Sequence, residues 1–312
     1  MRMRFWGVRG SLPAPLTPAQ IRSKISAVIE RLGPAPLPDA ETRERFLAGL
    51  PPWLFGTTGG NTPCIEVRLA GAASPVIFDA GSGLRELGAA LQLERPKPLD
   101  YHLFFSHFHW DHIQGFPFFS PAYDPEVTIN FYLPEENPSG PLDAQMRAPF
   151  FPVSLDTMRA QKNFIRLETE IPLGEARLRW RKMNHPGGSY AYRLDEGGRS
   201  LIYATDSELK PGDFAETDAN AAFFFNAGAI VIDAQYTPGE AVNKLNWGHS
   251  SYSLAVDFAA RWGIKRIILF HHDPAYDDRK LYHLLEAARE YAQGKDECLK
   301  VDMACEGMEL DV

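Results

Sequence analysis

Residues 106–112 read Ser-His-Phe-His-Trp-Asp-His and follow directly on the apolar run Leu103-Phe104-Phe105. Continuous apolar runs of this kind are typical of strands that are buried on both faces. Burying the three imidazoles and the carboxylate of this stretch in a core costs free energy, because each group needs a polar partner and protonated histidines repel one another. Divalent metals remove both costs, and the HxHxDH spacing predicts ligands for two of them.

Other apolar runs also end in ionisable side chains, namely Asp79, Asp206, Asp233 and His271. Between them lie patterns of helical periodicity, such as residues 252–262 and 279–293. Buried strands that alternate with helices predict an α/β fold whose reactive side chains gather at strand ends.

A two-metal site needs more ligands than one loop supplies. His185 begins a His-Pro-Gly-Gly turn after a predicted strand, and Asp206 and His271 each end one. Alone, each is equally well explained as a capping aspartate or a hydrogen-bonded core histidine. Together with the loop they complete a plausible set for two metals, with Asp206 able to bridge. The candidate ligands are His107, His109, Asp111, His112, His185, Asp206 and His271.

The chain has 312 residues, which we interpret as a single domain over 1–312 with two inserted segments. The first insertion, about 13–54, contains two helical patterns, at 18–32 and 40–50. The second, about 116–166, is rich in aromatic residues and prolines and predicts an irregular cover, either a substrate wall or plain packing. The first insertion is also a candidate contact in a homodimer, or a wall of the pocket.

Composition narrows the functional classes. Hydrophobic residues make up 45% of the chain, which is enough for a core, and no apolar run is long enough for a membrane span. The three cysteines lack CxxC spacing, and the N-terminus lacks the apolar stretch of a signal peptide, so we expect a cytoplasmic protein. The net charge of −8 argues against bulk binding of nucleic acid and favours a small substrate.

Five motifs together resemble the metallo-β-lactamase superfamily, and within it the branch of ribonuclease Z and class II cyclic-nucleotide-phosphodiesterase-like hydrolases. They are GVRGS at 7–11, GGNTPC at 59–64, DAGSGL at 79–84, SHFHWDHIQGFPFF at 106–119 and GHSS at 248–251 with LFHHDP at 269–274. The resemblance implies a four-layer αββα sandwich. It also implies one metal on His107, His109 and His185, a second on Asp111, His112 and His271, and Asp206 between them. His272 is the alternative to His271, because strand alternation lets only one of the pair face the metals.

The resemblance also bears on the metals and on two further residues. Position 109 is His where the oxygen-reducing branch has Glu, so an all-His/Asp site favours two Zn²⁺, with Mn²⁺ as the alternative. Asp79 is expected to support the ligands by fixing a histidine tautomer, or else to cap the helix that follows. His249 resembles the ribonuclease Z histidine that assists the leaving group, and the adjacent helix N-terminus favours a phosphate there; the alternative is an unrelated capping-region histidine. Independently of the resemblance, Phe108 and Trp110 lie inside the ligand loop and either stack on a base or pack under the loop.

These observations predict a dinuclear metal-dependent hydrolase, a phosphodiesterase for a small or cyclic nucleotide phosphodiester. A metal-bridging hydroxide would attack phosphorus, and Asp111, Asp206 and His249 would be the catalytic residues. The alternatives are an RNA endonuclease like ribonuclease Z, then a thioester or lactone hydrolase, then a non-catalytic sensor that keeps the fold.

Overall fold

Two mixed β-sheets form the centre of the protein in the computed structural model, which describes residues 1–34, 36–134 and 139–312. Residues 35 and 135–138, which fall within the two expected insertions, lie outside the described residues. In order across the first sheet, the strands are β14 (Glu309–Asp311), β1 (Arg2–Gly7), β2 (Cys64–Arg68), β3 (Val76–Phe78), β4 (Asp100–Phe104), β5 (Thr128–Leu133) and β6 (Gln161–Arg166). Across the second they are β13 (Lys300–Met303), β12 (Arg266–Phe270), β11 (Ala229–Asp233), β10 (Arg199–Ala204), β9 (Ser189–Glu196), β8 (Ala176–Met183) and β7 (Glu170–Leu173).

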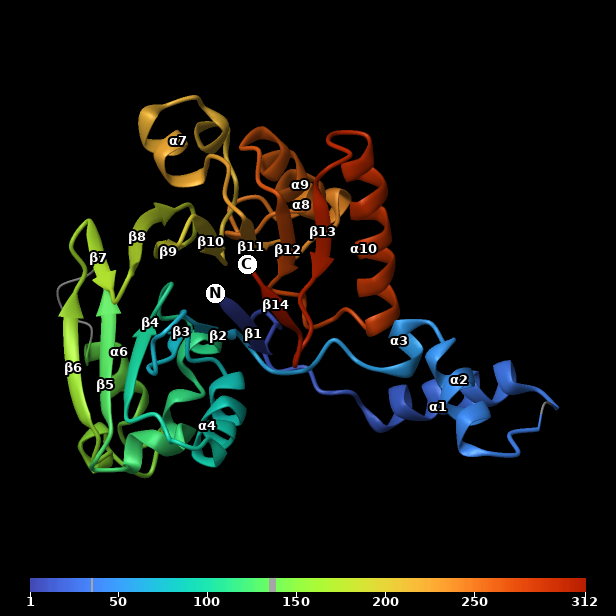
Figure 1. Cartoon of the computed structure of the whole chain (residues 1–312), viewed down its shortest axis with the longest axis horizontal. Coiled ribbons are helices and arrows are strands. Elements are labelled where there is room, and N and C mark those ends of the chain that lie inside the picture. Colours follow the sequence, from blue (N-terminus) through green and yellow to red (C-terminus); the bar gives the residue numbers. More distant parts are fainter. Residues whose placement is uncertain (35, 135–138) are drawn as a thin grey trace.

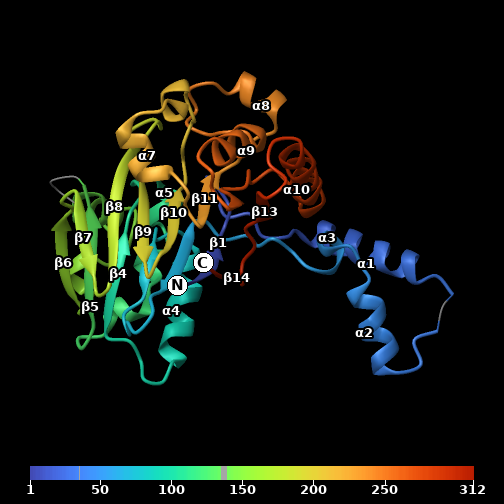
Figure 2. The same ribbon diagram turned by 45° about the horizontal axis from the view of Figure 1, so that its top comes forward.

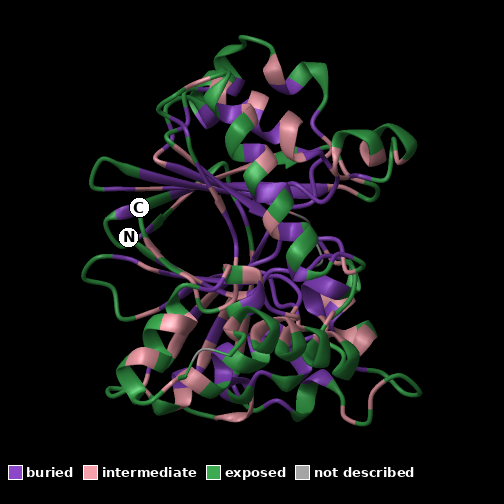
Figure 3. Ribbon diagram, turned by 90° about the vertical axis from the view of Figure 1, so that its right-hand side faces the viewer, coloured by how far each residue is buried: buried purple, intermediate pink, exposed green. Residues whose placement is uncertain are grey.

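The sheets face one another across a shared apolar core to which both contribute (Figure 3). Phe78 of the first sheet packs against two tyrosines of the second, with ring centroids 5.1 Å from Tyr203 and 5.7 Å from Tyr192. Burial on both faces explains why the central strands read as continuous apolar runs rather than as alternating patterns.

Helices cover the outer face of each sheet (Figure 1). Helix α4 (Gly83–Leu93) covers the first sheet, whereas α7 (Asp218–Phe224), α9 (Tyr252–Arg261) and α10 (Asp278–Gln293) cover the second. Shorter helices complete the chain: α5 (Trp110–Ile113), α6 (Ser139–Gln145) and α8 (Pro238–Asn243), with 3₁₀ turns at Phe116–Phe118, Ser120–Tyr123, Leu155–Thr157 and Pro211–Phe214. The predicted αββα sandwich is therefore confirmed. No described helix is long and apolar enough to cross a bilayer.

Strand direction decides where a site can form. Strands β3 and β4 run parallel in the first sheet, and β10, β11 and β12 run parallel in the second. Parallel neighbours end at the same edge of a sheet, so the polar residues that follow them are brought together.

The first expected insertion forms an arm of three helices, α1 (Pro18–Leu32), α2 (Ala40–Ala48) and α3 (Pro52–Phe55), which extends away from the sandwich (Figure 1, Figure 2). Lys24 of α1 fixes the arm to α10, because its ammonium lies 2.5 Å from the buried carboxylate of Asp278. Helix α1 has no buried residue among those described, and its isoleucines are largely exposed. The homodimer contact and the pocket wall stay predictions for this arm.

The second expected insertion is only partly an irregular cover, and this corrects the sequence interpretation. Strands β5 and β6 lie within residues 116–166 and extend the first sheet by parallel pairing. Alternation in Thr128–Leu133, where Ile129, Phe131 and Leu133 are buried, is the signal that the surrounding aromatic and proline residues obscured. Other described residues of the segment, such as Phe116, Phe119 and Leu155, pack in the core outside the first sheet.

We expect Phe78→Ala to lower the free energy of unfolding by about 3–5 kcal/mol, because it removes a ring that is buried between the two sheets. Phe225→Ala, at a phenylalanine that is 62% exposed, should change it by less than about 0.5 kcal/mol. Denaturant titration of both variants tests the role of the shared core, and similar effects at the two positions would contradict it.

Candidate metal centre

The predicted site residues follow the ends of strands. The 106–112 stretch follows β4, His185 follows β8, Asp206 follows β10 and His271 follows β12. Asp206 and His271 have left-handed backbone conformations, with φ of 46° and 61°. Such conformations are strained for residues other than glycine and occur often at functional sites.

One group of side chains joins four of the predicted ligands. Ligand atoms of His107, His109, His185 and Asp206 all lie within 4.8 Å of one another. The Oδ2 atom of Asp206 is 3.6 Å from Nε2 of His107 and 3.6 Å from Nε2 of His185. These separations leave room for a cation between the donor atoms.

A second group lies on the other side of Asp206. It consists of Asp111, His112 and His271, whose ligand atoms also lie within 4.8 Å of one another. The Oδ1 atom of Asp206 is 3.2 Å from Nε2 of His112 and 3.2 Å from Nε2 of His271. Asp206 therefore directs one carboxylate oxygen to each group, which is the arrangement of a bridging ligand.

Two buried histidine nitrogen atoms in the centre lack a hydrogen-bond partner of good geometry among the described residues. Nε2 of His107 and Nε2 of His112 are buried and form no hydrogen bond of good geometry among the described residues, although Oδ1 of Asp206 lies 3.2 Å from the His112 atom. Burial and the neighbouring His112 lower the pKa of His107 well below 6.5, so its imidazole is neutral and keeps a free lone pair. A divalent cation satisfies such atoms, and a His/Asp donor set suits zinc or manganese.

Charges around His112 lead to the same conclusion. Its burial opposes protonation, but the carboxylates of Asp111, Asp206 and Asp79 outweigh burial and raise the pKa of His112 well above 6.5. Without a cation, these carboxylates thus hold a proton on a fully buried imidazole. Cations would supply the positive charge that the carboxylates require.

Three of the imidazoles have their orientation fixed from behind. Nδ1 of His185 donates a 3.0 Å hydrogen bond to the Gly248 carbonyl. Nδ1 of His112 donates one of 2.8 Å to Asp79, and Nδ1 of His271 donates one of 3.2 Å to Oε1 of Gln235. Because Nδ1 is held in this way, each ring directs Nε2 toward the centre.

Asp79 is completely buried and supports the ligand loop. Besides the His112 bond, its carboxylate accepts bonds of 2.7 Å from the Ser106 amide, the Ser106 hydroxyl and the Tyr203 hydroxyl. The residue at the start of α4 is Ser82, and its side chain makes no capping bond. Of the two interpretations of Asp79, the geometry matches support of a ligand rather than capping.

Two glycine-containing motifs allow the backbone to approach the ligands. A Cβ atom at Gly10 would lie 2.5 Å from the His271 ring, and one at Gly248 would collide with His185. Next to Gly10, the Ser11 amide donates a 2.8 Å hydrogen bond to Oδ2 of Asp111. These contacts explain why the GVRGS and GHSS motifs belong to the site although they lie far from it in sequence.

His249 lies beside the second group, with a ring nitrogen within 4.8 Å of ligand atoms of Asp206 and His271. Its Nδ1 donates a 2.6 Å hydrogen bond to Asp233 Oδ2. Burial opposes protonation of His249, but the carboxylates of Asp233, Asp206 and Asp111, with Asp233 contributing most, outweigh burial and raise the pKa of His249 to about 9. Sequence reasoning missed Asp233 as a site residue, although it ends a strand just as Asp79 and Asp206 do.

The ambiguity between His271 and His272 has a geometric answer. His272 turns away from the centre, and its Nε2 donates a 2.9 Å hydrogen bond to the Ala304 carbonyl. Burial lowers the pKa of His272 to about 3, so this ring is a neutral core group. Gln235 and Tyr203, which hold His271 and Asp79, carry no signal in the sequence that marks them as site residues.

Solved structures of low sequence identity share this fold over nearly their entire length. They include the metallo-beta-lactamase fold protein YhfI from Bacillus subtilis (TM-score 0.65, 15% identity, 99% of this chain and 98% of that chain). A diphosphatase from the PhnP family has a TM-score of 0.63 and 17% identity, over 100% of this chain and 97% of that chain. The short form of human tRNase Z has a TM-score of 0.63 and 16% identity, over 100% of this chain and 99% of that chain. No curated protein matches the sequence.

A family profile described as "Beta-lactamase superfamily domain" matches residues 75–272. The matched region contains Asp79 and all seven of the clustered ligand candidates, from His107 to His271. By this match and by its four-layer fold, the chain belongs to the metallo-β-lactamase superfamily.

Proposed function

We propose that the protein is a dinuclear metal-dependent phosphodiesterase that acts on a small or cyclic nucleotide phosphodiester. The observation that carries the proposal is the position of Asp206, which directs one oxygen toward each of two groups of imidazole and carboxylate donors. His107, His109 and His185 would hold one cation, and Asp111, His112 and His271 the other.

The charge of this donor set favours an anionic substrate. When bound, two divalent cations would supply Lewis acidity and lower the pKa of a water molecule between them. Two positive charges from each cation against one negative charge from each of Asp111 and Asp206 leave a surplus of two positive charges. This surplus complements a phosphodiester, which carries one negative charge and gains more in the transition state.

His249 and Asp233 form the part of the site that handles a proton. Asp233 fixes the orientation of the ring through Nδ1 and favours its protonated form. His249 can then stabilise a phosphoryl oxygen or donate a proton to the departing alkoxide. A carbonyl hydrolase would use the same donors for a thioester or lactone, and assays must therefore include both substrate classes.

We expect metal-stripped protein to hydrolyse bis(p-nitrophenyl) phosphate only after zinc or manganese is added. Asp206→Asn should abolish this turnover, because it weakens the link between the two cation positions. Asp311→Asn, at an exposed aspartate of β14, is the matched control and should retain full activity. Turnover that is independent of metal, or full activity in Asp206→Asn, would refute the proposal. If protein that binds two metals showed no turnover, the proposal would be replaced by hydrolysis of carbonyl substrates and, if these also failed, by a sensor without catalytic activity.

His249→Ala should lower kcat by about 100-fold or more, which is the usual contribution of a positioned general acid. Metal content should stay at the level of the unmodified protein, because His249 is not among the proposed ligands. His283→Ala, at an exposed helical histidine, should leave both quantities unchanged. The proposed role of His249 would be contradicted if the His249→Ala variant lost its metals but recovered full turnover once the metals were added back.

Asp79→Asn should weaken zinc binding by about 10- to 100-fold, because it removes the carboxylate that accepts the hydrogen bond from Nδ1 of His112. Competition with a chromophoric chelator measures the affinity, and thermal unfolding of the metal-free protein separates this effect from a general loss of structure. Unchanged zinc affinity would show that Asp79 acts only as a structural carboxylate.

A further inference from the structure

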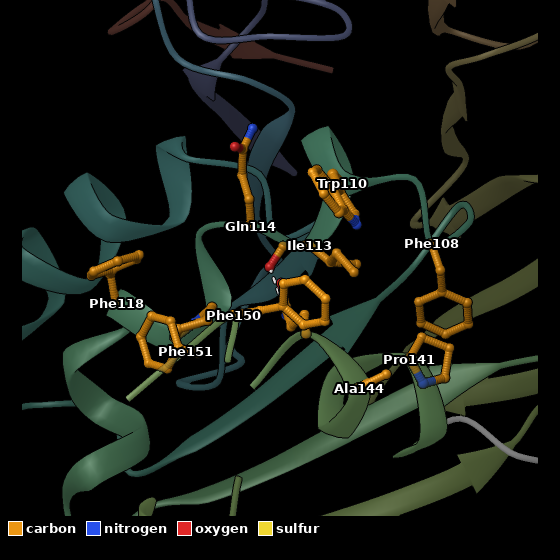
Figure 4. A pocket seen from close by; sticks show the side chains of 11 residues that line it. Phe108, Trp110, Ile113, Gln114, Phe118, Pro141, Ala144, Phe150 and Phe151 are labelled. Carbon is orange, nitrogen blue, oxygen red and sulfur yellow. Dashed lines mark hydrogen bonds between the residues drawn. The ribbon is translucent and has the colours of Figure 1, made fainter. Parts of the chain in front are cut away.

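A cavity of about 660 Å³ opens beside the 106–112 loop, between α5 and the segment that contains α6 and residues 150–151 (Figure 4). Its volume is in the range of small-molecule sites. The mechanism proposed above uses none of the side chains that line it.

The lining is uncharged and rich in aromatic rings. Five of the side chains are rings: those of Phe108, Trp110, Phe118, Phe150 and Phe151. No ionisable group is among the described residues that line the cavity. Its two glutamines already donate to the protein, Gln114 to the Thr62 hydroxyl (2.9 Å) and Gln145 to the Ile113 carbonyl (3.1 Å). An occupant therefore finds apolar surface and ring faces rather than ion-pair partners.

Rim and floor of the cavity differ in exposure. Phe108, Ile113 and Phe151 form the floor and pack against the core that lies outside the first sheet. Trp110, Phe118 and Phe150 form the rim, and they are 76%, 56% and 77% exposed. A concentration of exposed rings around a concave apolar surface is typical of a binding site, because folding alone gains nothing from their exposure.

Residues that line the cavity alternate along the chain with candidate metal ligands. Phe108 and Trp110 lie on either side of His109, and Ile113 directly follows His112. Adjacent Cα atoms are about 3.8 Å apart, so the backbone that lines the cavity lies next to the backbone that carries the ligand candidates.

We propose that this cavity binds a flat, uncharged aromatic group of the substrate while the anionic group of the same molecule lies at the metal centre. The inference rests on the proposed function for the anion and deepens it by narrowing the substrate class to phosphodiesters that carry an uncharged aromatic ring. Ring faces and edges on several sides of the cavity favour an aromatic group over an aliphatic chain.

Calorimetric titration of zinc-loaded protein with phenylphosphonate and methylphosphonate, neither of which has an ester bond to hydrolyse, tests the proposal. Phenylphosphonate should bind about tenfold or more tightly than methylphosphonate, because burial of the ring contributes its hydrophobic free energy. The double variant Phe118→Ala/Phe150→Ala should reduce that preference to about threefold or less. Phe225→Ala, which removes an equally exposed ring outside the cavity, should preserve it. Equal affinities in the unmodified protein, or an undiminished preference in the double variant, would overturn the proposal.

A second titration separates this inference from the proposed function. The neutral probe 2-naphthol should quench the fluorescence of Trp110, measured as the difference between the protein and its Trp110→Phe variant, with or without zinc. Quenching by 2-naphthol without binding of either phosphonate would support the aromatic cavity and count against the anion site. If the protein hydrolysed phosphodiesters but showed neither quenching by 2-naphthol nor a preference for phenylphosphonate, the proposed role of the cavity would be refuted and the proposed function would stand.

Discussion

The side chain of Asp206 stands between two groups of donors, with Oδ2 facing His107 and His185 and Oδ1 facing His112 and His271. Its burial would raise the pKa of the carboxyl, but the surrounding imidazoles hold that pKa well below its usual range. A buried carboxylate surrounded by imidazoles is costly unless cations complete the charge balance. The need to hold this group of ligands in place explains much of the surrounding structure.

That support comes from both sheets. Asp79 ends a strand of the first sheet, yet it accepts a hydrogen bond from Tyr203 of the second and holds both Ser106 and His112. Left-handed backbone at Asp79, Asp206 and His271 turns each side chain at the end of its strand. Such strain persists only where the surrounding structure imposes it, here through the shared core and the ligand hydrogen bonds.

Much of this arrangement could be predicted from the sequence because buried strands and their terminal polar residues leave a local signal. The apolar runs before Asp79, His107, Asp206 and His271 predicted both the strands and the edge at which these residues meet. The bounds 18–32 were predicted for α1 from helical periodicity, but periodicity does not tell what that apolar face packs against.

Other features required the folded chain. The choice between His271 and His272 depends on a turn at the strand end, and Asp233 became a candidate only when the fold brought His249 beside it. Strands β5 and β6 were hidden among aromatic and proline residues that cover the first sheet. Part of the same segment, including Phe118, Phe150 and Phe151, lines the apolar cavity.

A crystal structure of the zinc-loaded protein, with anomalous diffraction data collected at the zinc absorption edge, would show whether Asp206 lies between two cations. We expect two anomalous peaks, one within the His107, His109 and His185 group and one within the Asp111, His112 and His271 group, with an oxygen of Asp206 beside each. A single peak, or two peaks that do not share Asp206, would contradict it.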